Sequence, residues 1–330
     1  MRRLSCIVAA VLCLASAATA AVAQAPYPNR PIRVLIPYGP GGLTDVVARH
    51  YAERLRTVLG QNVIVDNKPG ASGIIALEQL ARAAPDGYTI MIGNISTNCL
   101  TPILLAKRMT IDYDRDVQIV ARTADAPVFF LSTTTNFPPA TFKEFIEYVR
   151  ARPGEIRYAS AGIGAYQHVN TEILAKRAGG LKMIHIPFKG GGAPILRDIA
   201  SGDTHVSWFN ITNPVGMIKA GKVRPLAVAS PQRLAAWPDV PTIDEVGFPG
   251  FHPSQWNAAF APAGVPREIV DKLHNAFAAV AKMPEMQAIF EKGGLRAPAD
   301  KSADDARAWL KREMDTWRKD IAEAGIKADE

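Results

Sequence analysis

The sequence predicts an α/β protein of two units, the second inserted into the first, with parallel-sheet domains around a central cleft. Short apolar runs alternate with amphipathic segments, which is typical of strands and helices that alternate along a parallel sheet. The pattern begins at Ile32 and begins again at Val128. A Pro- and Gly-rich segment without a clear period, 238–253, then suits a connection back to the first unit. At 330 residues, with 48% apolar and 21% charged residues, the chain is long enough for two hydrophobic cores.

The N-terminus has the three parts of a secretory signal peptide. Arg2 and Arg3 are basic, 4–18 is apolar, and Ala21-Val22-Ala23 fits a small-x-small cleavage site. Loss of those two arginines would lower the formal charge from +7 to +5, and Cys99 would be the mature chain's one cysteine. No later run approaches membrane-spanning length. We therefore expect a periplasmic protein, with a signal peptide at 1–23, a first domain at 24–124 plus 248–330, and a second domain at 125–247.

Glycine-rich turns follow the expected strands of the first unit. The strand 32–36 leads into a turn with Gly41 and Gly42, and an amphipathic helix then runs from about Thr44 to Gly60. Strands are also expected at 63–65 and 88–92, each followed by a turn of small residues. Free N–H groups and helix N-termini converge at the carboxyl ends of parallel strands, so these turns indicate an anion site. The alternative, that Gly41 and Gly42 only make a tight corner, stays open.

The second unit repeats this arrangement, and the chain then ends in helices. Thr141 and Glu144 form a capping box for a helix that reaches Arg150. Strands are expected at 128–131, 156–159, 183–186, 205–209 and 226–229, with turns at 160–166 and 188–192 that lead into helices. After a strand at 256–261, helices are expected at 266–283, 284–291 and 302–324, the last with Ser302 as its N-cap.

The residues in these turns favour binding over catalysis. The sequence has no G-x-S-x-G, H-E-x-x-H or C-x-x-C motif and no P-loop lysine, and its six histidines lack metal-ligand spacing. We therefore expect no catalytic residue, no cofactor and no metal. Lys and Arg are scattered, which argues against a nucleic-acid partner. Hydrogen bonds to a charged group contribute about 1.5–3 kcal/mol each. Four or five of them therefore reach the roughly 8 kcal/mol of micromolar affinity.

Several motifs, in this order along the chain, resemble the Bug receptors, the extracytoplasmic solute receptors of tripartite tricarboxylate transporters. They are YPNRPIRVLIPYGPGGLTD, VDNKPGASG, AAPDGYTIMIG, YASAGIGAYQH, IPFKGG, IKAGKVRPLAVAS, VPTIDEVGFPGF and FAPAGVP. The resemblance covers the chain from about Tyr27 onward. It implies a type II Venus-flytrap periplasmic binding protein for a small carboxylate, acting as a monomer with the membrane permease subunits as partners. A receptor for an ATP-driven importer or a sensor, or a secreted enzyme on the same fold, is the alternative.

The resemblance also implies the binding residues. Backbone amides of two first-domain loops, matching 38–45 and 94–98, would hold the carboxylate, and closure would add the 160–168 turn and the strand end at Asn210. The expected ligand-binding residues are Tyr38, Gly41, Gly42, Thr44, Asp45, Asn94, Ser96, Thr97, Asn98, Ser160, Gly162, Gly164, Ala165, Tyr166, His168, Phe209 and Asn210.

Two departures leave the identity of the ligand open. Asn210 stands where many relatives have aspartate, and Asn170-Thr171 replace small apolar residues. Aromatic residues near the turns predict either an aromatic-acid pocket or core packing, and both interpretations remain: Tyr38, Tyr166, Phe188, Phe209 and Trp256. The ligand is therefore expected to be a mono- or dicarboxylate, aliphatic or aromatic.

Overall fold

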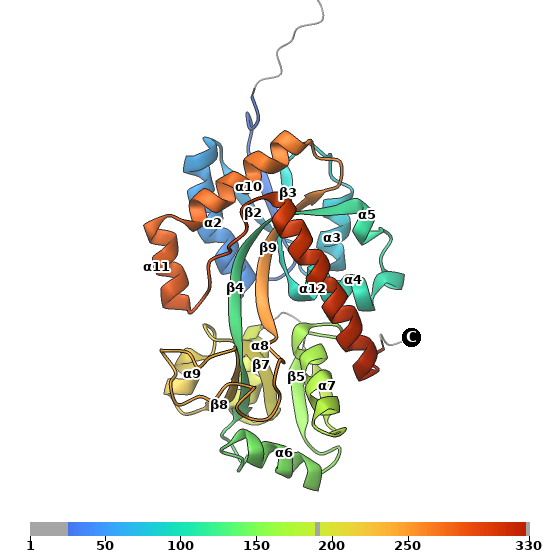
Figure 1. Cartoon of the computed structure of the whole chain (residues 1–330), viewed down its shortest axis with the longest axis vertical. Helices are drawn as coiled ribbons and strands as arrows, with labels where there is room; N and C mark the ends of the chain where they lie inside the picture. The colour runs from blue at the N-terminus through green and yellow to red at the C-terminus, as the bar shows by residue number, and fades with distance from the viewer. Residues whose placement is uncertain (1–25, 189–191, 328–330) are drawn as a thin grey trace, which may run out of the picture.

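The computed structural model of the protein describes residues 26–188 and 192–327. The predicted signal peptide, with Cys6 and Cys13, lies outside the described residues. Figure 1 shows two lobes stacked along the long axis, with the strands β4 and β9 running between them. In the described part of the chain, no helix is both long enough and apolar enough to cross a membrane.

The first lobe, at the top of Figure 1, is built on three parallel strands. They lie in the order β2 (Val63–Asn67), β1 (Ile32–Ile36) and β3 (Thr89–Asn94). Val34 and Ile36 of β1 pack in one apolar cluster with α2 (Leu43–Leu59) and α10 (Arg267–Ala281), while Leu35 packs with α3 (Ile74–Ala81) in another. Apolar side chains on both faces explain why Val34, Leu35 and Ile36 follow one another in β1 without alternating with polar residues.

The second lobe repeats this plan with its own parallel strands. β5 (Arg157–Ser160) pairs in parallel with β6 (Ile184–Pro187) and β7 (Val206–Asn210). The other elements of this lobe are α6 (Phe142–Ala151), α7 (Tyr166–Arg177), α8 (Gly192–Ser201), α9 (Val215–Lys219) and β8 (Val223–Ala229). The predicted capping box is confirmed at α6, where Thr141 and Glu144 each satisfy the other's backbone N–H. The parallel arrangement that the alternating pattern predicts is thus present in both lobes.

Two antiparallel strands join the lobes, and the sequence did not predict their form. β4 (Val117–Thr133) pairs with β9 (Ser254–Pro262) as far as Pro127, and from Val128 onward it pairs with β7 and β8 instead. The expected domain boundary at 124/125 therefore falls inside a continuous strand. The two predicted domains and their bounds stay a prediction.

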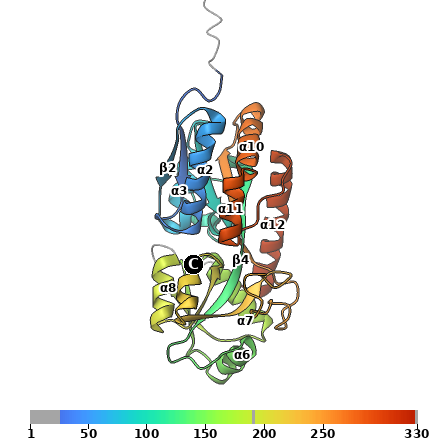
Figure 2. The ribbon, with the colours of Figure 1, turned by 90° about the vertical axis from the view of Figure 1, so that its left-hand side faces the viewer.

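The remaining helices pack around the first lobe, and the last of them also reaches the second. They are α4 (Thr101–Leu104), α5 (Tyr113–Asp116), α11 (Pro284–Gly293) and α12 (Ala303–Ala324), with short turns η1 (Ala71–Gly73), η2 (Ser96–Leu100) and η3 (Ala106–Arg108). Ser302 caps α12 as predicted, because its side chain accepts a hydrogen bond from the Asp305 amide. Figures 1 and 2 both show α12 running alongside the two lobes, and Arg177 of α7 pairs with Asp320 of α12 at 3.4 Å.

Candidate functional site

A cavity of about 320 Å³ lies between the lobes, at the carboxyl ends of β1, β3 and β7. The strands and turns of the first lobe contribute Tyr38, Gly39, Pro40, Gly41, Gly42, Leu43, Thr44, Asn94, Ser96 and Gln255 to its wall. The second lobe contributes Ala161, Tyr166, Gln167, Gly192, Ala193, Leu196, Phe209, Asn210 and Asn213. None of these described lining residues is Lys, Arg, His, Asp or Glu. Polar contacts to an occupant must therefore come from amides, hydroxyls and backbone groups on this part of the wall.

The turn between β1 and α2 leaves backbone amides open to the cavity. Gly41 has a φ of +88°, a left-handed conformation that glycine adopts without strain. Gly42 caps α2 with an extended backbone and no side-chain hydrogen bond. The first amides of a helix have no partner within the helix. At α2 they therefore meet the cavity through a glycine cap, together with the positive end of the helix dipole.

Asp45 holds this turn in place from behind. Its carboxylate accepts hydrogen bonds from the Gly41 amide at 2.9 Å, from the Asn67 side chain at 2.9 Å, and from Arg49 at 3.0 Å. Burial disfavours the charged carboxylate, but the bonds from Arg49, Gly41 and Asn67 outweigh it, so the pKa of Asp45 is lowered. Asp45 does not line the cavity. Its role in the structure is to position the Gly41 turn.

A buried hydrogen-bond network fixes the orientation of the side-chain amide of Asn94, at the end of β3. Its Oδ1 accepts from the Tyr38 hydroxyl at 2.8 Å and from the Thr97 amide at 3.3 Å. Burial raises the pKa of Tyr38, so its phenol keeps the proton that it donates. With Oδ1 committed to these donors, the side-chain nitrogen of Asn94 points toward Thr44.

Thr44, in the first turn of α2, becomes a hydrogen-bond donor as a result. Its Oγ1 accepts from Asn94 Nδ2 at 3.1 Å and from Asn257 Nδ2 at 2.8 Å. A hydroxyl oxygen has two lone pairs and one proton, so two accepted bonds leave the proton to be donated. Thr44 lines the cavity, and this donor lies in the same helical turn as the open amides of α2. Together they form a donor-rich corner that suits an anionic oxygen.

The glycine turn of the second lobe, 160–166, has four of its amides already bonded. The Gly162 amide donates to Ser160 Oγ at 3.0 Å, the Gly164 amide to His168 Nδ1 at 3.3 Å, and the Ala165 amide to the Gly162 carbonyl at 3.1 Å. The Tyr166 amide, the first of α7, donates to Ser96 Oγ of the first lobe at 3.0 Å. The Tyr166 bond connects the lobes, and the four bonds together leave this turn with few donors for a ligand.

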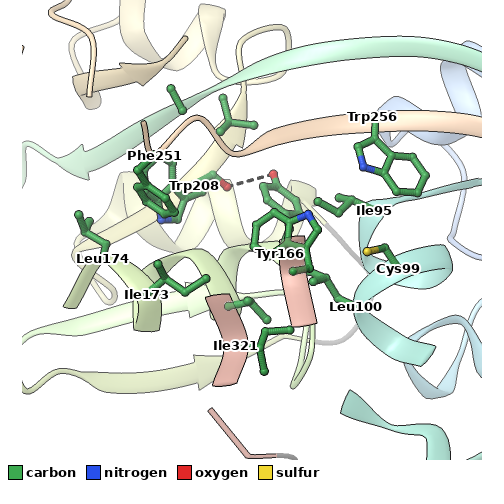
Figure 3. Close-up of a cluster of buried hydrophobic side chains, with 14 of the residues drawn as sticks. Ile95, Cys99, Leu100, Tyr166, Ile173, Leu174, Trp208, Phe251, Trp256 and Ile321 are labelled. Carbon is green, nitrogen blue, oxygen red and sulfur yellow. Dashed lines mark hydrogen bonds between the residues drawn. The ribbon is translucent and has the colours of Figure 1, made fainter. Parts of the chain in front are cut away.

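Tyr166 extends the contact between the lobes into the hydrophobic core. Its phenol donates to the Trp208 carbonyl at 3.1 Å, as the dashed line in Figure 3 shows. On the other side of its ring lie Ile95 and Leu100 of the first lobe, which belong to the same buried cluster. Tyr166 thus packs in the core and also borders the cavity.

The structure brings about half of the predicted binding residues to the cavity wall. The lining set contains Tyr38, Gly41, Gly42, Thr44, Asn94, Ser96, Tyr166, Phe209 and Asn210. The others lie beside or behind the wall and do not line it: Asp45, Thr97, Asn98, Ser160, Gly162, Gly164, Ala165 and His168. Of the aromatic candidates, Tyr38, Tyr166 and Phe209 line the cavity, whereas Phe188 and Trp256 pack in the hydrophobic clusters. As binding residues, all of them stay predictions.

The polar lining side chains that were missed all carry amides: Gln167, Asn213 and Gln255. Gln167 follows the predicted turn residue Tyr166, and Asn213 lies three residues after the predicted strand end at Asn210. Both could have been found by including the neighbours of each turn and strand end. Gln255 had no such signal, because it lies at the start of β9 and not at the carboxyl end of a strand. In the described residues, no group of three or more His, Cys, Asp or Glu side chains is placed to hold a metal ion.

The sequence and the structure of this chain both resemble those of known proteins. A family model described as tripartite tricarboxylate transporter family receptor matches residues 47–326. Protein BugT of Bordetella pertussis (strain Tohama I) is 31% identical over 327 residues, which is 99% of each chain.

Two solved structures with similar sequences were obtained with carboxylates. Rpa4515 of R. palustris, with adipate, is 32% identical with a TM-score of 0.85, over 91% of this chain and 99% of that one. MatC (Rpa3494) from Rhodopseudomonas palustris, with bound malate, is 30% identical with a TM-score of 0.82, over 89% of this chain and 100% of that one.

Proposed function

The chain belongs to the tripartite tricarboxylate transporter receptor family, and we propose that it captures a small carboxylate and delivers it to the permease of such a transporter. As a member of a family of solute receptors, it is a binding protein and not an enzyme. The proposal includes a periplasmic location, a monomeric receptor, and a mono- or dicarboxylate ligand.

One observation carries the choice of a carboxylate: the donor-rich corner at the start of α2. The open amides beside Gly42 and the hydroxyl proton of Thr44 all belong to this first turn. An acceptor-only group such as a carboxylate satisfies them together, and the helix dipole favours its negative charge. The adipate and malate in the two similar structures support the same ligand class.

The proposal also assigns the two lobes as the two domains that close on the ligand. β4 and β9 are the continuous strands between the lobes, so bending is expected where β4 changes partners after Pro127. The contact of the Tyr166 amide with Ser96 Oγ spans the lobes beside the cavity. Closure would therefore be coupled to ligand binding through that contact.

A thermal-shift screen followed by calorimetry tests the ligand class. The panel contains adipate, malate, succinate, benzoate and nicotinate, with glucose and a neutral amide as controls. A ligand at a hundred times its Kd stabilises the folded state by about 2.7 kcal/mol, so a carboxylate at that level should raise Tm by several degrees. The proposal is wrong if only the sugar or the amide raises Tm.

Two further measurements separate the receptor role from its alternatives. Mass spectrometry of the recovered carboxylate should find it chemically unchanged, whereas a secreted enzyme would convert it. Uptake into vesicles that carry a two-component tripartite tricarboxylate permease should depend on added receptor and on an ion gradient. Uptake driven by ATP would point to an importer of the other class.

A further inference from the structure

The cavity has a second polar wall, where β7 ends and β9 begins. Asn210 is the last residue of β7 and Gln255 is the second residue of β9; both are buried and both line the cavity. The hydrogen bonds of this wall determine which end of each side-chain amide faces the cavity.

Asn210 has its amide orientation fixed by the backbone. Its Oδ1 accepts from the Thr212 amide at 3.2 Å and from the Asn213 amide at 3.1 Å. An amide nitrogen cannot accept a hydrogen bond, so turning the side chain over would set NH₂ against two N–H groups. Asn210 therefore presents its Nδ2 on the other side, where it donates to Gln255 Oε1 at 3.0 Å.

This bond fixes the orientation of Gln255 in turn. With Oε1 held by Asn210, the group that Gln255 has left is Nε2, which carries two protons. Among the described residues, Nε2 has no acceptor. Gln255 lines the cavity, so this nitrogen offers a hydrogen-bond donor to an occupant. Without the bond to Asn210, the amide could turn over and offer its oxygen, an acceptor, instead.

We propose that Gln255 binds an acceptor group at the second end of the ligand, and that Asn210 sets specificity by positioning Gln255. The inference rests on the proposed function, in which the first carboxylate sits at the start of α2. It narrows the ligand class to acids whose other end is a carboxylate, carbonyl or hydroxyl oxygen. An ammonium group at that end would face N–H donors and would be rejected.

Matched acids that differ only at the second end test this inference. The six-carbon series is adipate, hexanoate and 6-aminohexanoate, and the four-carbon series is succinate, butyrate and 4-aminobutyrate. The series that binds wild-type protein more tightly by calorimetry is then used throughout. We expect the diacid to bind at least tenfold more tightly than the acid with a methyl end, and the amino acid to bind most weakly.

Gln255→Met tests the direct contact, because methionine has nearly the same shape and no donor. The diacid should lose about tenfold in affinity, while the acid with a methyl end should change less than twofold. Gln232→Met, at an exposed position, is the control and should change neither affinity. An unchanged ratio of the two affinities in Gln255→Met overturns the contact.

Asn210→Asp tests the positioning role. The carboxylate still accepts from the Thr212 and Asn213 amides, but it cannot donate to Gln255. Gln255 then turns its Nε2 toward the carboxylate and its Oε1 toward the cavity, so the preference should invert in favour of the amino acid. A merely structural role would weaken the diacid and the amino acid by the same factor, and that result overturns the positioning role.

The two levels of the proposal fail differently. If neither series binds wild-type protein, the proposed carboxylate function fails and the inference fails with it. If the diacid binds but Gln255→Met keeps its preference, only the inference fails.

Discussion

The two glycine turns that face each other across the cavity have similar sequences and different roles. The first, 38–44, leads from β1 into α2, and the second, 160–166, leads from β5 into α7. In the first turn the amides at the start of the helix are open, and Asp45 supports the turn from behind. In the second turn the amides of Gly162, Gly164, Ala165 and Tyr166 are all bonded within the protein.

The difference shows that a glycine turn at a strand end is only a potential anion site. Whether it binds depends on whether another part of the chain already uses its amides. Ser96 of the first lobe takes the Tyr166 amide, and nothing comparable reaches the start of α2 among the described residues. The second turn therefore acts as a contact between the lobes, whereas the first keeps open amides at the place where we propose that the ligand binds.

The largest change in ligand affinity is expected from Gly42→Val, in the first turn. The Gly42 backbone is extended, at φ −76° and ψ 164°, and an added Cβ there meets no heavy atom within 4 Å beyond its chain neighbours. The fold should therefore survive, with a loss of about 1 kcal/mol because valine is a poor N-cap residue. The valine methyl groups would crowd the open amides, and affinity for the carboxylate, measured by calorimetry, should fall more than tenfold.

Gly216→Val is the matched control, since Gly216 is exposed in α9 and also has open space around it. It should leave the affinity unchanged. If folded Gly42→Val protein binds the carboxylate as tightly as wild type, the binding site does not lie at the first turn.

The sequence predicted the order of strands and helices because those patterns are local. It did not predict the full length of β4, since Asp125 and Pro127 interrupt the apolar run and proline is disfavoured within a sheet. The structure places Pro127 where β4 changes partners from β9 to β7, and a missing N–H is tolerated there. The strand end predicted an anion site at the turn with Gly41 and Gly42, and Thr44 was expected there only from the family resemblance. The bonded state of the second turn was not, because Ser96 lies 70 positions before Tyr166.

A smaller effect, and one that depends on pH, is expected from Asp45→Asn. Because the pKa of Asp45 is lowered in the folded state, its stabilisation is present above its ordinary value of 3.8 and is lost as pH falls through the lowered value. At neutral pH the variant should be less stable by roughly 1–2 kcal/mol, since hydrogen bonds to a charged group are lost. Its affinity should fall about threefold as the Gly41 amide loses its anchor, which corresponds to roughly 0.65 kcal/mol.

Unfolding curves between neutral and strongly acidic pH measure this effect. The gap in Tm between wild type and Asp45→Asn should narrow below the ordinary pKa of the carboxyl. Asp315→Asn, which removes an exposed carboxylate paired with Lys311 and Arg318, is the control and should leave affinity unchanged. A gap that stays constant with pH would mean that Asp45 does not hold the first turn through its charge.

An effect no larger than that of Asp45→Asn is expected from a matched pair, Gly41→Ala and Gly164→Ala, which separates the two turns most directly. Both glycines have positive φ, +88° and +78°, and an added Cβ comes no closer than 3.7 Å to other atoms. Each alanine should therefore cost a similar strain of roughly 1–2 kcal/mol in unfolding free energy. Calorimetry should then show about a threefold loss of affinity for Gly41→Ala alone, because only in the first turn does strain shift amides that the ligand needs. Equal losses of affinity in the two variants would mean that the second turn also contacts the ligand, despite its bonded amides.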